Sequence, residues 1–178
     1  MDLSRATTIE GWMNLKELEW IANQAKEAKV IIEVGCLKGR STRAWCDNTE
    51  GIVYAVDTWA GPYYANNGKV LWDQIYLENA RNEFHVNLKD CGNLIVYRGN
   101  FQDFSEFLTT VPDIIFIDGD HRYENVKNDL LTACQIIKPG GIISGHDYGH
   151  EDWPGVRQAV DEFFPQVYTE KSIWWTVQ

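Results

Sequence analysis

The chain has 178 residues, and its 44% hydrophobic and 24% charged composition predicts one globular domain over residues 1–178 rather than a disordered chain, a collagen-like fibre or a coiled coil. Sixteen basic against twenty-six acidic residues give a net charge of −10, without the basic cluster that a nucleic acid partner requires. No apolar run approaches the roughly 18 residues of a membrane span, and the N-terminus lacks a signal-like apolar stretch, so we expect a cytoplasmic protein with no membrane partner.

Five short apolar runs alternate with amphipathic stretches along the chain. The runs occupy residues 29–35, 51–57, 93–99, 112–120 and 140–147. Their apolar residues are continuous rather than alternating with polar ones. This pattern indicates burial on both faces, which is typical of parallel strands covered by helices.

Apolar residues at three- and four-residue spacing predict the helices. These cover residues 15–25, 39–46, 123–137 and 154–164. Asn14 with Glu17 resembles a capping box at the first helix, and Pro154 and Pro165 bound the last one. The tail, residues 167–178, predicts an antiparallel edge hairpin. The chain is therefore expected to form an α/β fold, a doubly wound and mostly parallel sheet with helices on both faces.

Ligands of such sheets bind at the carboxyl ends of the strands. Gly35 and Gly39 follow the first strand with a Gly-x-x-x-Gly spacing, which differs from the dinucleotide fingerprint and also suits a plain tight turn. Asp57 ends the second strand, where an acid can accept both hydroxyls of a ribose or act as a turn residue. Together the glycine loop and Asp57 predict a cofactor that contains a nucleoside.

Polar residues follow the other three strands as well. Asn100 and Phe101 are placed to contact an adenine by hydrogen bonding and stacking. The fourth and fifth strands are followed by acids and histidines: Asp118, Asp120, His121, His146 and Asp147. Such a cluster can hold a divalent cation through its carboxylates or supply a general base, although Asp120 could instead cap the next helix.

Four stretches, EVGCLKGRST, VYAVDTW, IDGDHRYENVKNDL and IKPGGIISGHDY, resemble class I S-adenosylmethionine-dependent methyltransferases. The resemblance is nearest to the small group of macrolide-sugar O-methyltransferases and cephalosporin-hydroxylase-like proteins. It extends over about residues 10–165. It implies a Rossmann-like methyltransferase fold, S-adenosylmethionine as cofactor, and a methyl acceptor that is a hydroxyl of a small molecule or sugar.

The resemblance also implies roles for matching positions. The cofactor contacts it implies are Glu33, Gly35, Gly39, Ser41, Asp57, Asn100, Phe101 and Asp118. Metal-dependent relatives bind magnesium at the positions of Asp118 and Asp147. A divalent cation, with magnesium as the first candidate, is therefore expected between these two acids, with His146, where several relatives have an acid, as a third ligand. An imidazole there suits manganese, iron or zinc better than magnesium. The catalytic base is expected to be His121 or Asp120.

Two other interpretations remain open. An NAD-dependent oxidoreductase would share the sheet and the ribose-binding acid, although the glycine spacing and the acid–histidine cluster disfavour it. A catalytically silent nucleotide-binding module could keep the same fold. The segments 59–72 and 149–155 are expected to cover the pocket. Trp12 could be a third cover or a core anchor, and the core is the favoured place. The sequence predicts neither the particular acceptor nor the oligomeric state.

Overall fold

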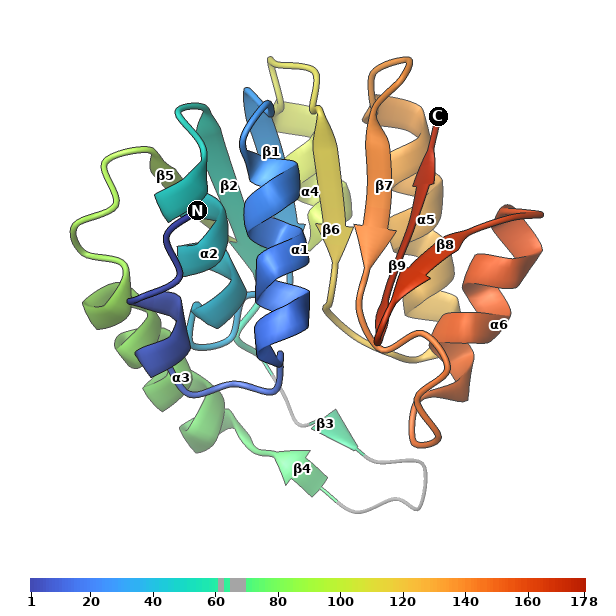
Figure 1. The fold of residues 1–178 in the computed structure, drawn as a ribbon. Helices are drawn as coiled ribbons and strands as arrows, with labels where there is room; N and C mark the ends of the chain where they lie inside the picture. The colour runs from blue at the N-terminus through green and yellow to red at the C-terminus, as the bar shows by residue number, and fades with distance from the viewer. Residues whose placement is uncertain (61–62, 65–69) are drawn as a thin grey trace.

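A computed structural model describes residues 1–60, 63–64 and 70–178. Within these residues a seven-stranded sheet runs in the order β5-β2-β1-β6-β7-β9-β8, with helices on both faces (Figure 1). The strands are β1 (Val30–Val34), β2 (Ile52–Asp57), β5 (Leu94–Arg98), β6 (Ile114–Ile117), β7 (Ile142–Gly145), β8 (Tyr168–Glu170) and β9 (Ile173–Val177). The first five of these strands are parallel, which confirms the predicted doubly wound sheet.

The predicted helices form close to their expected bounds. The helical elements are η1 (Ala6–Thr8), α1 (Leu15–Ala25), α2 (Arg40–Asn48), α3 (Gln74–Asn87), α4 (Phe101–Phe107), α5 (Tyr123–Ile136) and α6 (Pro154–Phe163). The capping box of α1 is present, with the Asn14 side chain accepting from the N–H of Glu17 and the Glu17 carboxylate accepting from the N–H of Asn14. Helices α3 and α4 are additions to the elements expected from the sequence.

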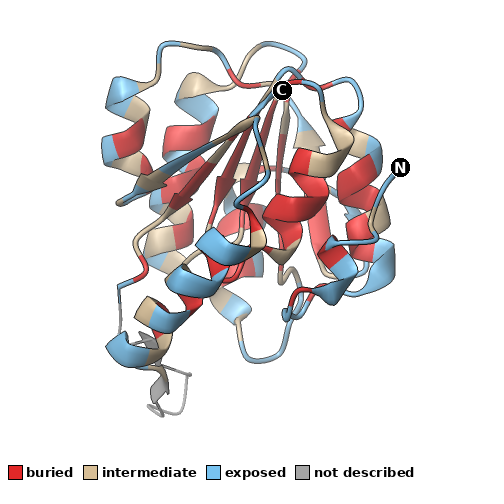
Figure 2. Cartoon of the chain, turned by 90° about the vertical axis from the view of Figure 1, so that its left-hand side faces the viewer, coloured by how far each residue is buried: buried red, intermediate tan, exposed pale blue. Residues whose placement is uncertain are grey.

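Each face of the sheet has its own hydrophobic core. Ile31 belongs to the core beneath α1 and α2, and the next residue, Ile32, belongs to the core beneath α4, α5 and α6; both are fully buried. Figure 2 shows buried residues gathered on the strands and on the inner faces of the helices. Burying such a side chain stabilises the fold by about 1.5–3 kcal/mol, so continuous apolar runs select a sheet that is covered on both sides.

The C-terminal hairpin closes one edge of the sheet. Strand β9 pairs antiparallel with both β7 and β8, and Lys171 has a φ of 57° in the turn between β8 and β9. The N–H group of Tyr148 donates to the carbonyl of Ser172, which ties this turn to the segment that follows β7. The predicted edge hairpin is therefore confirmed, and its turn lies at the carboxyl end of the parallel strands.

Trp12 departs from its expected place in the core. Its side chain is 66% exposed, and its ring lies 5.4 Å from that of Trp72, the last residue of β4 (Val70–Trp72). Strand β4 pairs with β3 (Tyr63–Tyr64) outside the main sheet. Of the expected cover segment 59–72, residues 61–62 and 65–69 lie outside the described residues. None of the helices in the described part of the chain combines the length and apolar character that crossing a bilayer would need.

Candidate active site

A cleft of about 1120 Å³ lies at the carboxyl ends of the parallel strands. Most of the residues predicted from the sequence to form the site line it: Gly35, Ser41, Asp57, Asn100, Phe101, Asp118, Asp120, His121, His146 and Asp147. The segment from Glu10 to Asn14 and the residues Trp72, His150 and Trp153 complete its rim. Glu33 and Gly39 lie outside this lining and can shape the cleft only from behind.

The loop after β1 requires its two glycines for different reasons. Gly35 has a φ of 86°, and a Cβ there would lie 2.1 Å from the carbonyl oxygen of Asp118, so only glycine fits. Gly39 has a φ of 88°, and a Cβ there would lie 2.3 Å from a methyl carbon of Leu88, just beyond α3. Gly35 thus brings the loop against the end of β6, whereas Gly39 lets α2 pack close to α3.

Asp57 holds the same loop by hydrogen bonds. Its Oδ2 accepts from the N–H groups of Cys36 at 2.7 Å and Leu37 at 3.0 Å, and its Oδ1 accepts from the N–H of Trp59 at 2.8 Å. Burial raises the pKa of Asp57 despite these three donors. A carboxylate has about four acceptor sites, so it retains capacity for a ligand hydroxyl. Asp57 therefore acts as a turn residue and also lines the cleft.

Glu33 and Ser41 link β1 to the start of α2. The Glu33 side chain is fully buried and accepts a hydrogen bond from the hydroxyl of Thr42. Burial raises the pKa of Glu33 to about 7 against the hydrogen bonds of Ser41 and Thr42. Ser41 lines the cleft and is in a position to contact a ligand there, whereas Glu33 does not line it.

Asn100 and Phe101 begin helix α4. The side-chain oxygen of Asn100 accepts from the N–H of Asp103 at 2.8 Å and caps the helix. Phe101 is 1% exposed and belongs to the core beneath α4 and α5, although it also borders the cleft. Both residues have structural roles, and their contact with an adenine stays a prediction.

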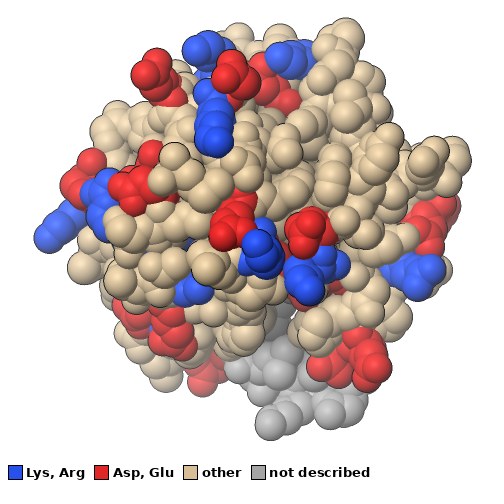
Figure 3. Space-filling model, in the orientation of Figure 1, with Lys and Arg blue, Asp and Glu red and all other residues tan. Residues whose placement is uncertain are grey.

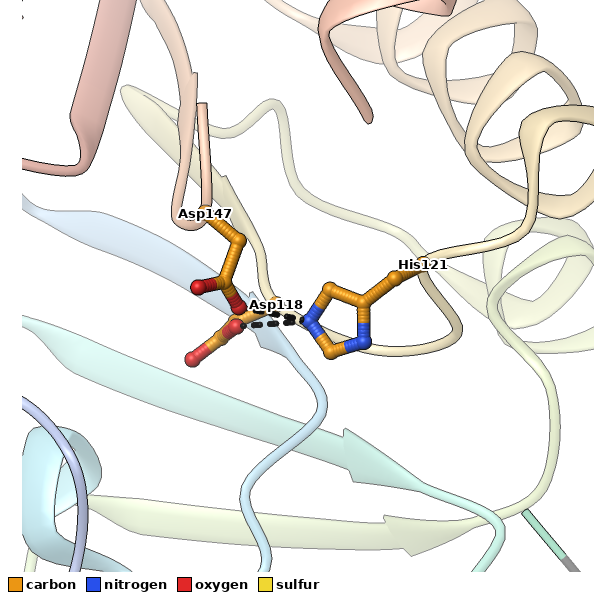
Figure 4. Close-up of side chains that lie close together, drawn as sticks. All are labelled: Asp118, His121 and Asp147. Atoms are coloured by element: carbon orange, nitrogen blue, oxygen red, sulfur yellow. Dashed lines mark ion pairs between the residues drawn. The ribbon is translucent and has the colours of Figure 1, made fainter. Parts of the chain in front are cut away.

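Two acids and two histidines meet where β6 and β7 end. His121 Nε2 lies 2.8 Å from Asp147 Oδ2 and 3.5 Å from Asp118 Oδ1 (Figure 4). One ligand atom from each of these three residues lies within 4.8 Å of the others. His146 adjoins the group, with its Nδ1 3.4 Å from Asp147 Oδ2 and 3.8 Å from Asp118 Oδ1.

Charges in this cluster stabilise one another. Burial disfavours the imidazolium forms, but the neighbouring carboxylates outweigh it and raise the pKa of His121 to about 9 and that of His146 to about 11. The two histidines hold the pKa of Asp147 well below its usual range despite its burial. Asp147 also has a φ of 59°, a conformation that costs a non-glycine residue about 1–3 kcal/mol and is common at functional sites.

The two candidate bases have different surroundings. Asp120 accepts from the backbone N–H of Arg122 at 3.0 Å and from its guanidinium. Although burial opposes it, this pairing lowers the pKa of Asp120. The ring of His121 instead stacks on that of Trp153, 4.8 Å away between centroids and tilted by 24°. His121 is therefore the base candidate that faces the carboxylates of Asp118 and Asp147.

Glu17 is predicted from the sequence only as part of a helix cap, although it also lies beside the acid–histidine cluster. Glu17 is 2% exposed, and its Oε1 lies 3.3 Å from His146 Nε2. Although burial opposes ionisation, His146 and the N–H group of Asn14 lower the pKa of Glu17. The position of Glu17 in the sequence indicates a capping box, but nothing in the local sequence indicates its contact with His146.

Comparison with known proteins assigns the class. Residues 32–148 match the family model described as a methyltransferase domain, and the chain belongs to this family of class I S-adenosylmethionine-dependent methyltransferases. A stretch of 68 residues is 38% identical to an uncharacterized protein of Acanthamoeba polyphaga mimivirus and covers 36% of this chain and 31% of that protein. The chain thus spans about a third of the length of this curated relative.

Solved structures share the fold at low sequence identity. The O-methyltransferase of Bacillus cereus in complex with S-adenosylhomocysteine superposes with a TM-score of 0.70 and 18% identity, covering 97% of this chain and 86% of that one. The TDP-rhamnose 3′-O-methyltransferase CalS11 of calicheamicin biosynthesis gives a TM-score of 0.65 and 15% identity, covering 90% and 77%. The predicted Rossmann-like methyltransferase fold is confirmed.

Proposed function

We propose that this enzyme transfers the methyl group of S-adenosylmethionine to a hydroxyl of a small molecule or sugar. The observation that carries the proposal is the cluster of Asp118, His121 and Asp147, which borders the same cleft as the glycine loop. A cofactor in that loop and an acceptor near the cluster would share one cleft. Aligning two bound reactants can supply several kcal/mol of the barrier.

The cofactor would lie along the ends of β1, β2 and β5. Asp57 would accept a ribose hydroxyl, Ser41 and the backbone at Gly35 would border the methionine part, and Asn100 with Phe101 would border the adenine. Glu33 and Gly39 would act from behind by fixing the position of α2. The hydrogen bond from Thr42 to Glu33 and the close packing of Gly39 against Leu88 support this placement, because both contacts shape the loop that the cofactor would touch.

The acid–histidine cluster fits a divalent cation. Single carboxylate oxygens of Asp118 and Asp147 lie within 4.8 Å of each other. His146 Nδ1 lies 3.8 Å from Asp118 Oδ1 and 3.4 Å from Asp147 Oδ2, so two carboxylates and one imidazole nitrogen converge there. Asp118 and Asp147 would hold the cation, with His146 Nδ1 as the third donor. When bound, the cation would lower the pKa of the acceptor hydroxyl. The mixed oxygen and nitrogen donors favour manganese at least as much as magnesium.

His121 would remove the proton of the acceptor. As the sulfur–carbon bond of the sulfonium breaks and the new oxygen–carbon bond forms, the hydroxyl proton would pass to His121 Nε2. Trp153 covers the imidazole ring and limits its contact with water. Asp120 is the second candidate for this role, but its pairing with Arg122 and its lowered pKa make it the weaker base.

Aromatic rings at the mouth of the cleft favour a small, flat or sugar-like acceptor. Trp12, Trp72 and Trp153 all line the cleft, and the first two are in contact. Such rings bury a large apolar area with little loss of side-chain entropy. On the face in Figure 3, basic and acidic residues are interleaved rather than gathered into a basic patch, which also suits a small acceptor better than a nucleic acid.

A thermal-shift comparison tests the cofactor first. S-adenosylhomocysteine should raise the melting temperature, whereas NAD should leave it unchanged. A rise in melting temperature with NAD alone would instead identify an oxidoreductase. No change with either compound would favour a catalytically silent nucleotide-binding module. A panel of hydroxylated sugars and phenols, together with amine and thiol analogues, should then be incubated with S-adenosylmethionine. Mass spectrometry should find the hydroxyl compounds heavier by one methyl group less one hydrogen atom. Methylation confined to amines or thiols would contradict the proposed oxygen acceptor.

A further inference from the structure

Glu17 lies at the meeting point of three separate parts of the chain. Its Oε2 accepts from the N–H of Asn14 at 2.8 Å, at the start of α1. Its Oε1 accepts from the N–H of Ser172 at 3.1 Å, in the turn between β8 and β9. The same Oε1 lies 3.3 Å from His146 Nε2, just after β7. A capping box alone explains only the first of these contacts.

His146 is held between this carboxylate and the acid cluster. Its Nε2 makes a close charge contact with Glu17 rather than a well-aligned hydrogen bond, and its Nδ1 faces Asp147 Oδ2 at 3.4 Å and Asp118 Oδ1 at 3.8 Å. The side chains of Glu17 and His146 are 2% and 8% exposed, so water screens the pair little. Turning the imidazole over about its Cβ–Cγ bond would place carbon atoms where Nε2 now faces Glu17 and where Nδ1 now faces the two acids.

We infer that Glu17 is a positioning residue that holds His146 with its Nδ1 directed at Asp118 and Asp147. A carboxylate partner on one imidazole nitrogen fixes the orientation and tautomer of the ring, and thereby the donor that the other nitrogen presents. This inference rests on the proposed function, since that assigns Asp118 and Asp147 to the cation. Glu17 would act on the reaction through His146, without touching either substrate.

The sequence offers a matched pair of variants. Glu17→Gln keeps the shape of the side chain and suits the capping position, but it removes the negative charge and one of the two oxygens that serve Asn14, Ser172 and His146. Asn14→Ala removes the other half of the capping box, the side-chain acceptor for the N–H groups of Lys16 and Glu17, and leaves the Glu17 carboxylate in place. Both variants weaken the start of α1, but only the first changes the partner of His146.

The experiment measures Mn²⁺ affinity by calorimetry in the full chain without S-adenosylmethionine. Loss of a partner of this kind typically weakens metal affinity by about 10–100-fold, so Glu17→Gln should bind Mn²⁺ at least about tenfold more weakly than wild type. Asn14→Ala should stay within about twofold of wild type. Equal affinities in wild type and Glu17→Gln, or an equal loss in both variants, would overturn the inference.

A second measurement keeps the inference independent of the metal. In ¹⁵N-histidine-labelled protein, the ring nitrogen resonances of His146 should shift in Glu17→Gln and not in Asn14→Ala. If wild type binds no Mn²⁺, the metal proposal fails, and these resonances decide the role of Glu17: an unchanged spectrum in Glu17→Gln overturns it. S-adenosylhomocysteine should raise the melting temperature of wild type, Glu17→Gln and Asn14→Ala alike. This rise shows that the cofactor still binds, so a negative result for Glu17 or for the metal is distinguished from failure of the proposed function.

Discussion

The indole of Trp153 lies over the imidazole of His121, with ring centroids 4.8 Å apart and an interplanar angle of 24°. Trp153 precedes α6 and His121 precedes α5, so the contact joins the segments that follow β7 and β6. The stack leaves the edge that bears Nε2 directed at Asp118 and Asp147, as Figure 4 shows. The geometry thus shields the face of the ring while its reactive nitrogen remains among the acids.

Replacing His121 should impair the reaction itself. We expect His121→Ala to lower turnover at least about a hundredfold, as is typical for loss of a general base, while calorimetry shows unchanged affinity for S-adenosylhomocysteine. Because the pKa of His121 is raised to about 9, only a small fraction is neutral at pH 7, and wild-type turnover should rise between pH 7 and pH 9. If His121→Ala retains full activity and Asp120→Asn loses it, the two roles must be exchanged.

Replacing Asp57 should weaken the cofactor complex. Loss of hydrogen bonds to a charged group costs about 1.5–3 kcal/mol, so Asp57→Ala should weaken S-adenosylhomocysteine binding by more than about tenfold in calorimetry. The control is Asp73→Ala, because Asp73 also accepts a backbone N–H, from Tyr76, but lies outside the cleft lining. Unchanged affinity in Asp57→Ala would refute the ribose contact.

Removing divalent cations should abolish methyl transfer, because the proposed site holds a cation. After treatment with EDTA and gel filtration, we expect little turnover, with recovery on addition of Mn²⁺ or Mg²⁺. The half-buried carboxylates of Asp118 and Asp147 favour such an ion, since hard cations bind oxygen donors. Full turnover in excess chelator, with no metal found by elemental analysis, would show that the two acids act without a cation.

Asp129 should make stability depend on pH in a defined direction. Its carboxylate is 8% exposed, accepts a hydrogen bond from Gln102 at 2.7 Å, and burial raises its pKa to about 6. The pKa of Asp129 is higher in the folded than in the unfolded chain, so ionisation of Asp129 destabilises the fold. The loss of stability is complete above about pH 6 and absent at pH values well below 4. Asp129→Asn should therefore stabilise the protein by about 1–2 kcal/mol at pH 7.5.

The advantage of Asp129→Asn should disappear as the pH falls toward 4. Melting temperatures measured across this range test the prediction. Asp103→Asn, a change at an exposed position beside Gln102, is the control and should show no such trend. A difference between Asp129→Asn and wild type that is constant with pH would mean that the carboxyl of Asp129 does not titrate there.

Much of the fold could be predicted because burial on two faces leaves a plain mark in the sequence. Ile31 and Ile32 must both be apolar when each faces a different core, and runs of this kind identified all five parallel strands. Helix α3 leaves a weaker mark, since only Leu77, Ala80 and Phe84 are buried among its fourteen residues. A helix that covers so little apolar surface has no clear amphipathic pattern.

The candidate site was predictable in position where its residues follow the ends of strands, as at Asp57 and Asp118, which line the cleft. It was not predictable where a contact joins distant segments, as between Glu17 and His146. The exposed position of Trp12 was not predictable either, because the sequence does not distinguish a tryptophan in a core from one at the rim of a cleft. Only the packing of neighbouring elements distinguishes these cases.

The hydrogen bond from Ser172 to Glu17 connects residues 155 positions apart in the chain. Contacts of such long sequence separation form late in folding, because closing a long loop costs entropy before the contact can repay it. During synthesis, Glu17 leaves the ribosome long before Ser172 does. A nascent or partly folded chain can therefore build the central strands and the glycine loop and still lack the contact between Glu17 and the C-terminal hairpin.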